Sequence, residues 1–184
     1  MGPVAEDDGK PRAGGHGGAG VGLGELHFKD GLARRRGGPK VFAIPFEAVV
    51  AGVGAVYQVL CEVDDAGADA AITQYFYNVE SYFYFLDQCA AAGIDKPIYA
   101  GVMPITNFSN LARFSRNCGA EIPRWICQRI EGFGDDQESI RKFGVEVVTQ
   151  LCQTLLDSGA PGIHFYTMNQ SAATLAIMNN LNLK

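Results

Sequence analysis

The stretch GIHFYTMNQS, residues Gly162–Ser171, decides how the fold is interpreted. Its run from Ile163 to Tyr166 is typical of a buried strand, and the polar turn 167–170 separates it from a second apolar run, SAATLAIMNNL. The pattern therefore predicts a strand, a turn and a helix. Because ligands of α/β folds bind at the carboxyl ends of parallel strands, the polar residues of this turn are candidates for a binding site.

Two similar units precede this stretch along the chain. Strands are predicted at residues 70–76, 97–103 and 162–167, with helical segments after each of them. This alternation favours parallel strands joined by helical crossovers, so the predicted fold class is α/β. A closed eight-stranded βα barrel needs about 250 residues, more than this region holds. The chain is therefore predicted to form a small open sheet or part of a larger barrel.

Capping residues mark where the predicted helices begin and end. Asn78 is the expected N-cap of the helix after the first strand, and Thr106 or Asn107 that of the helix after the second. Asp135 is expected to open the long helix that precedes the third strand, with Glu138 completing a capping box. Glycines at the carboxyl ends of the three helices are expected stops: Gly93, Gly119 and Gly159.

The amino-terminal region has a different composition. Residues 1–40 are rich in Gly, Pro, Arg and Lys, so we expect them to lack regular structure. Residues 41–65 form an apolar segment of uncertain origin, whose part Val41–Cys61 has about the length of a membrane span. The polar residues Glu47 and Gln58 favour a buried strand over residues 41–44 and a core helix over a span.

Composition excludes several classes of function. The net charge of −5 argues against general binding to nucleic acid or to a membrane surface. The five cysteines lack the spacing of zinc ligands and are expected to be reduced thiols, mostly buried. No apolar core follows the first residues as in a signal peptide, so the expected location is cytoplasmic.

Parallel strands would bring three polar groups to one rim of the sheet. These are Gln74, the turn 104–107 and the segment 166–170. The rim would hold carboxamides, a phenol and aromatic faces, which suit the edge and the face of a flat heteroaromatic ligand. The alternative is that Gln74 and Tyr166 are polar core residues with satisfied hydrogen bonds.

Four phrases, GADAAITQYFYNVESY, AGIDKPIYAGVMPITNFSNLARFS, IPRWI and GIHFYTMNQ, carry a resemblance to a known family. In this order, from about residue 66 to residue 184, they resemble the methylenetetrahydrofolate reductases. The resemblance implies a (β/α)8 TIM barrel that binds FAD, with NAD(P)H as co-substrate and a folate as substrate. It also implies that this chain holds only the last three βα units, behind the amino-terminal tail 1–40 that its composition predicts to be disordered.

The resemblance implies roles for five residues. Gln74 matches a glutamine that contacts both the nicotinamide of the NAD(P)H co-substrate and the folate pterin, Phe114 a phenylalanine of the substrate site, and Tyr166 a tyrosine of the flavin pocket. Asn110 and Gln170 occupy substrate-binding positions where the family often has glutamine and usually has arginine, respectively. Loss of that arginine would weaken a charge-assisted contact to an anionic ligand.

The family's general acid has no recognisable counterpart in this chain, so no catalytic residue is assigned. Basic contacts to the flavin phosphates are expected near residues 61–63, where the sequence is acidic. The function implied by the resemblance is flavin-dependent reduction of 5,10-methylenetetrahydrofolate to 5-methyltetrahydrofolate with NAD(P)H, although the chain alone is expected to retain FAD poorly and to show no activity. The alternative is a non-catalytic fragment that associates with a full-length reductase subunit or with its own copies.

Overall fold

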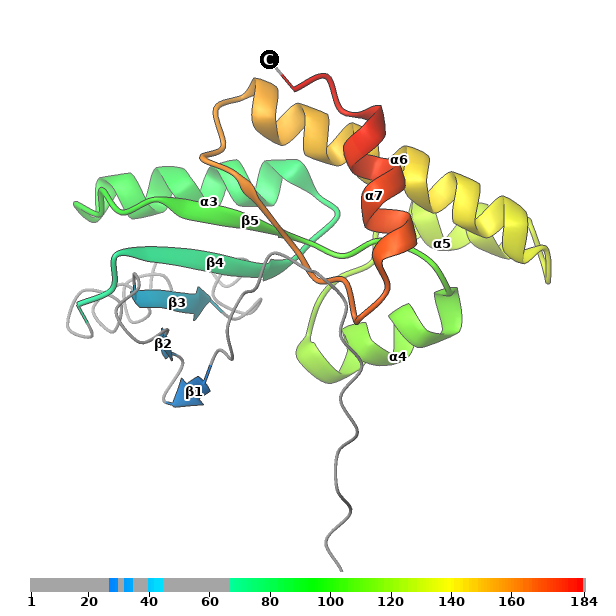
Figure 1. Ribbon diagram of the computed structural model, residues 1–184, viewed down its shortest axis with the longest axis horizontal. Coiled ribbons are helices and arrows are strands. Elements are labelled where there is room, and N and C mark those ends of the chain that lie inside the picture. Colours follow the sequence, from blue (N-terminus) through cyan, green and yellow to red (C-terminus); the bar gives the residue numbers. More distant parts are fainter. Residues whose placement is uncertain (1–26, 30–31, 35–39, 45–66, 184) are drawn as a thin grey trace, which may run out of the picture.

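The computed structural model describes residues 27–29, 32–34, 40–44 and 67–183. Its strands form one six-stranded sheet in sequence order: β1 (His27–Lys29), β2 (Leu32–Arg34), β3 (Lys40–Ile44), β4 (Ala70–Tyr75), β5 (Ile98–Val102) and β6 (Ile163–Phe165). The first three strands pair antiparallel, whereas β3, β4, β5 and β6 run parallel. Among the described strands, β1 and β6 are the two edges of an open sheet (Figure 1).

The three strands predicted after residue 66 are confirmed, and so is their parallel pairing. Each is shorter than predicted: β4 lacks the last predicted residue, β5 lacks the first and the last, and β6 lacks the first and the last two. Tyr166 lies beyond β6, yet its N–H still donates to the Val102 carbonyl at 2.8 Å. The predicted strand at residues 41–44 is also confirmed, as β3, in which Ile44 is buried and Val41 and Ala43 are half-buried.

Two expectations about the amino-terminal region are wrong. Regular structure occurs within residues 1–40, because β1 and β2 form an antiparallel hairpin that pairs with β3. The parallel part of the sheet has four strands, one more than the three predicted. Strands of three residues carry too short a pattern to be recognised from the sequence. The helix expected after β3 lies outside the described residues.

Five helices follow β4 in the described chain: α3 (Val79–Ala91), α4 (Phe108–Cys118), α5 (Arg124–Glu131), α6 (Gln137–Asp157) and α7 (Ser171–Asn180). Asn78 and Asn107 cap α3 and α4 as predicted, because their side chains accept the N–H groups of Glu80 and Asn110. None of the described helices combines the length and apolarity that a membrane crossing requires.

The predicted cap of α6 is wrong by one residue. Asp136, not Asp135, is the N-cap, and its Oδ1 accepts the N–H groups of Glu138 and Ser139, each at 3.1 Å. Glu138 therefore lies at the second helical position and pairs with Lys142 at 2.8 Å instead of reaching back to the cap. The two adjacent aspartates are equivalent in sequence, so only the path of the backbone distinguishes them.

Aromatic side chains dominate the core on the helix-covered side of β4 and β5. Phe76 stacks on Tyr82 of α3 with ring centroids 5.4 Å apart, and the buried Tyr82 hydroxyl donates to the Ile98 carbonyl at 2.7 Å. Burial raises the pKa of Tyr82 to about 12, so this donor stays protonated. The contact fixes α3 against the start of β5 (Figure 1).

Two glycines allow close packing around β5. A Cβ on Gly101 would overlap the Thr73 carbonyl of β4, and one on Gly144 of α6 would overlap the Ile105 carbonyl after β5. The Gly101 N–H also donates to the Thr73 hydroxyl at 2.9 Å. The Gly101 contacts hold β5 close to β4, and the Gly144 contact places the turn after β5 directly against α6.

The four described cysteines carry free thiols. Cys89 and Cys152 are buried, and Cys118 and Cys127 are half-buried. Burial raises the pKa of Cys89 to about 11 and that of Cys152 to about 12, so both thiols stay protonated near neutral pH. No group of three or more His, Cys, Asp or Glu residues suited to a metal ion occurs in the described part of the chain.

Candidate functional site

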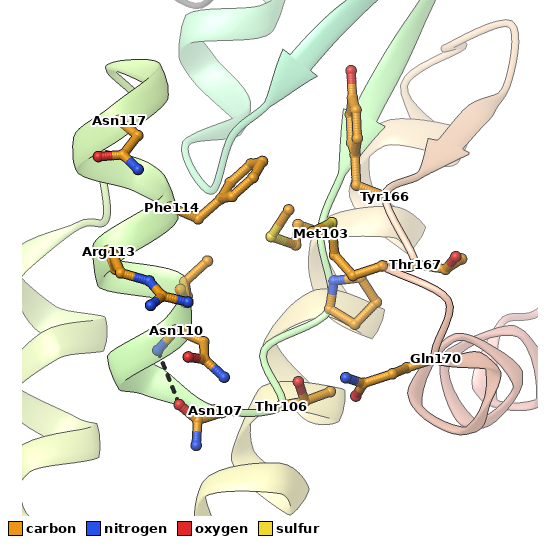
Figure 2. Close-up of a pocket in the computed structure, with 13 residues that line it drawn as sticks. Met103, Thr106, Asn107, Asn110, Arg113, Phe114, Asn117, Tyr166, Thr167 and Gln170 are labelled. Carbon is orange, nitrogen blue, oxygen red and sulfur yellow. Dashed lines mark hydrogen bonds between the residues drawn. The ribbon is translucent and has the colours of Figure 1, made fainter. Parts of the chain in front are cut away.

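A cavity of about 570 Å³ lies where β5 and β6 end. Figure 2 shows that α4 forms one wall and the segment after β6 forms the other, with the turn after β5 between them. The residues that line it are Met103, Pro104, Thr106, Asn107, Asn110, Leu111, Arg113, Phe114, Asn117, Tyr166, Thr167, Met168 and Gln170. The carboxyl ends of parallel strands thus form a pocket, as the sequence predicts.

One face of α4 supplies most of the first wall. Asn110, Arg113, Phe114 and Asn117 follow the spacing i, i+3, i+4, i+7 and therefore line one side of the helix. The Asn107 side chain caps the helix by accepting the Asn110 N–H at 2.9 Å, which is the dashed bond in Figure 2. The α4 wall is therefore a polar stripe with one aromatic ring.

Tyr75 holds α4 to the sheet. Its hydroxyl forms a 2.8 Å hydrogen bond with the Ser115 hydroxyl, and its ring lies 6.0 Å from that of Phe114. Burial, together with a hydrogen bond to Cys118, raises the pKa of Tyr75, so the phenol is protonated. Phe114 remains 36% exposed despite this contact, so part of its ring surface is available to a ligand.

The opposite wall begins at Tyr166. Its hydroxyl donates to the Thr73 carbonyl at 3.1 Å, and its ring packs edge to face on His164 at 4.8 Å. Burial raises the pKa of Tyr166 and lowers that of His164, so both side chains are neutral near pH 7. The hydroxyl is thus satisfied within the protein, as the polar-core alternative predicts, while the residue still lines the cavity.

The turn after Tyr166 completes this wall. Met168 and Asn169 adopt left-handed backbone conformations with φ of 49° and 60°, and the Gln170 N–H donates to the Thr167 carbonyl at 2.9 Å. Gln170 is the N-cap of α7, but its side chain makes no capping hydrogen bond. Figure 2 shows that side chain directed across the cavity toward Thr106, so its amide is available to a ligand.

Arg113 is the charged side chain of this cavity, because every other lining residue is neutral and none is a carboxylic acid. It lies exposed on α4, and Figure 2 shows its guanidinium directed toward the cavity. No ion pair to Arg113 occurs within the described residues. The cavity therefore combines a positive charge with amides and aromatic rings, and it suits a flat ligand that carries an anionic group.

The structure brings together four of the five predicted site residues: Asn110, Phe114, Tyr166 and Gln170. Gln74 is not among the lining residues. Gln74 lies next to Tyr75 in β4, where the register of β4 against β5 shifts between Ile72 and Tyr75. Its Oε1 accepts the Tyr75 N–H at 3.1 Å, and within the described residues its Nε2 forms no hydrogen bond.

Sequence reasoning missed Arg113 and Asn117. Their signal was present: once Asn110 and Phe114 are assigned to a site on a helix, the positions three residues after each share that helix face. Met103 and Met168 carried no such signal, because methionines near a strand end are equally compatible with core packing.

Together the fold and the cavity define an α/β protein whose ligand site lies at the carboxyl ends of parallel strands. The family model described as methylenetetrahydrofolate reductase matches residues 55–182. The chain belongs to this family, which confirms the resemblance. The match begins within the apolar segment 41–65, so the similarity starts earlier than residue 66.

Individual relatives agree with the family assignment. The chain is 38% identical over 120 residues to the 5,10-methylenetetrahydrofolate reductase of Escherichia coli K12, covering 65% of this chain and 40% of that protein. It is 40% identical over 120 residues to methylenetetrahydrofolate reductase 2 of Saccharomyces cerevisiae, covering 20% of that protein. The chain therefore spans less than half the length of these relatives.

A solved structure supports the fold independently. It is an uncharacterized protein from Clostridium thermocellum described as binding two copies of 5-methyl-5,6,7,8-tetrahydrofolic acid. The similarity has a TM-score of 0.52 at 18% sequence identity and covers 75% of this chain and 50% of that one. At this identity the similarity concerns the fold alone.

Proposed function

We propose that the cavity between α4 and the turn 167–170 binds the folate in the flavin-dependent reduction of 5,10-methylenetetrahydrofolate to 5-methyltetrahydrofolate with NAD(P)H. Family membership supports this reaction class. In this proposal the parallel strands β3 to β6 belong to a (β/α)8 barrel of a cytoplasmic enzyme. The related fold in the Clostridium protein, which is described as binding a methylated folate, is consistent with the proposed ligand.

One observation carries the proposal: a partly exposed aromatic ring and unengaged carboxamides face each other across one cavity. Phe114 offers a ring face for stacking, and Asn110 and Gln170 offer amides from opposite walls. A pterin ring needs both, since its face is aromatic and its edge alternates donors and acceptors. Arg113 adds a positive charge for the anionic end of the folate.

In this proposal Tyr166 would line the FAD pocket, and Gln74 would contact the nicotinamide of the co-substrate NAD(P)H. Gln74 fits the role because its Nε2 group has no hydrogen-bond partner within the described residues and can donate to the edge of a ring. Tyr166 fits as a neutral ring fixed at the strand end by its bond to Thr73. When bound, FAD supplies the hydride chemistry between NAD(P)H and the folate, and these residues orient the two ring systems.

Proton donation to the folate is the part that the cavity's residues do not provide. None of the lining residues is a carboxylic acid, and the Tyr166 proton is engaged with the Thr73 carbonyl. General-acid assistance is worth about 10²–10⁴ in rate. This observation favours a second candidate, a ligand-binding but non-catalytic component that associates with a full-length reductase subunit or with copies of itself.

Two measurements test the proposal and separate its candidates. Titration of the purified chain with 5-methyltetrahydrofolate by calorimetry should show binding, and Phe114→Ala should weaken it about tenfold because stacking on the ring is lost. Tyr84→Ala is the matched control, since Tyr84 is an aromatic residue of α3 that is 54% exposed and does not line the cavity. Equal effects of the two variants would contradict the proposed site.

The activity assay follows NAD(P)H oxidation with FAD and menadione. Sustained turnover by the chain alone would support the complete enzyme. No turnover by the chain alone, together with a change in the turnover of an added full-length reductase when the chain is present, would support the second candidate. A chain that binds no folate in the titration would contradict both.

A further inference from the structure

A second cavity adjoins the first. It has a volume of about 450 Å³ and lies between α6, α7 and the turn after β5. Four residues line both cavities: Thr106, Asn107, Asn110 and Gln170. The two cavities therefore adjoin at a wall of short polar side chains, which includes Asn110 and Gln170.

The second cavity also has one charged residue. Gln137, Arg141 and Val145 lie at successive turns of α6 and line one side of it. On the other side, α7 contributes only alanines and Gln170, so there is room for a chain-like group. Arg141 is exposed, forms no ion pair within the described residues, and has no carboxylate beside it in the cavity lining.

We propose that this second cavity is a subsite for the anionic tail of the ligand whose flat head occupies the first cavity, with Arg141 as the cation that binds the tail. The proposal rests on the proposed function. In this subsite the positive charge comes from Arg141 of α6, on the far side of the shared wall. The site can therefore bind an anionic tail although position 170 holds a neutral glutamine. A guanidinium binds carboxylates and phosphates in a bidentate manner, so either group can be the anion.

The experiment measures how affinity depends on the tail. The full chain is titrated by calorimetry with 5-methyltetrahydropteroate, which lacks a glutamate, and with the mono- and triglutamate forms of 5-methyltetrahydrofolate. NADH is titrated in parallel as the phosphate-bearing ligand. We expect the triglutamate to bind about tenfold more tightly than the pteroate, as one charge-assisted contact provides.

Arg141→Ala should abolish this preference while leaving the affinity for the pteroate unchanged, and Arg141→Lys should retain part of it. Lys142→Ala is the matched control, because it removes the same charge from the next position of α6 outside the cavity lining. If Arg141→Ala lowers the affinity for NADH instead of the affinity for the folates, the anion in the subsite is a phosphate and the proposed subsite is still supported.

Three outcomes would overturn the proposal. The first is a tail preference that survives Arg141→Ala but is lost in Arg113→Ala, which would place the tail at the other end of the first cavity. The second is an equal loss in Lys142→Ala, which would indicate general electrostatic attraction. The third is that the wild-type chain binds all three folates with equal affinity and that Arg141→Ala does not change the affinity for NADH. A chain that binds no folate would overturn the proposed function as well, so the two failures are distinguishable.

Discussion

The two walls of the first cavity are anchored in different ways. The α4 wall is fixed at its start by the Asn107 cap, along its length by buried Leu111, and through Ser115 by the phenol of Tyr75. The opposite wall follows β6, a half-buried strand of three residues that pairs only with β5 among the described strands. Its turn adds Met168 and Asn169, both in left-handed conformations.

This difference indicates where stability and binding can be separated. Side chains that hold the α4 wall are buried and engaged with the sheet, so changing them should affect folding first. Residues of the turn after β6 are exposed and few of them have partners, so changing them should affect the ligand more than the fold. The predictions below test this contrast from the best anchored position to the least.

The largest loss of stability is expected for Gly101→Ala in β5. The added Cβ would overlap the Thr73 carbonyl of β4, and neither backbone can move without breaking the parallel ladder. Overpacking of this kind should lower the free energy of unfolding by about 3 kcal/mol. Urea denaturation measures the change. Gly93→Ala is the control, because an added Cβ meets open space there and the backbone has a left-handed φ of 84°. The strain of this conformation alone should lower the free energy of unfolding by about 1 kcal/mol. A larger loss in Gly93→Ala would contradict the role given to β5.

Removal of one hydroxyl from each wall compares their anchors directly. Tyr75→Phe leaves the buried Ser115 hydroxyl without this partner and should cost about 1.5 kcal/mol. Tyr166→Phe removes a 3.1 Å bond from the edge of the sheet to the Thr73 carbonyl and should cost about 0.5 kcal/mol. Urea denaturation of both variants provides the comparison. The reverse order would show that the β6 wall is the better anchored one.

His164 should make the β6 wall sensitive to acid. Burial lowers its pKa in the folded state, whereas the unfolded chain takes up the proton near the ordinary value of 6.5. The unfolded state therefore binds more protons in this range, and stability should be complete above pH 6.5 and fall as the pH drops through the folded-state pKa. His164→Asn should flatten the slope of unfolding free energy against pH below 6.5. An unchanged slope would assign the acid sensitivity to other groups.

The smallest effect is expected in the turn itself. Met168 has a φ of 49°, which a glycine adopts without the steric cost of a Cβ. Met168→Gly should therefore stabilise the fold by about 0.5 kcal/mol after the entropy of the unfolded glycine is included. Asn169→Gly is the matched control and should change stability by less than about 0.3 kcal/mol, because asparagine tolerates this conformation. Destabilisation by Met168→Gly, measured by thermal unfolding, would show that the Met168 side chain contributes packing that its exposure does not indicate.

The sequence alone determined the elements from residue 67 onward and the family. Strand alternation, the asparagine caps and the glycine stops are local signals, since they depend on residues only a few positions apart. Four of the five predicted site residues also lie in one cavity, because polar residues at the ends of parallel strands and at the start of the next helix necessarily meet at one rim. These properties follow from chain geometry over short distances.

Only the tertiary structure decided the rest. It paired the β1–β2 hairpin with β3, selected Asp136 over Asp135 as a cap, left Gln74 out of the cavity lining, and placed Arg113 and Arg141 in two adjoining cavities. Each of these outcomes depends on how segments from different parts of the chain pack. Local periodicity fixes which residues share a face of a helix or strand, but only packing decides what that face contacts.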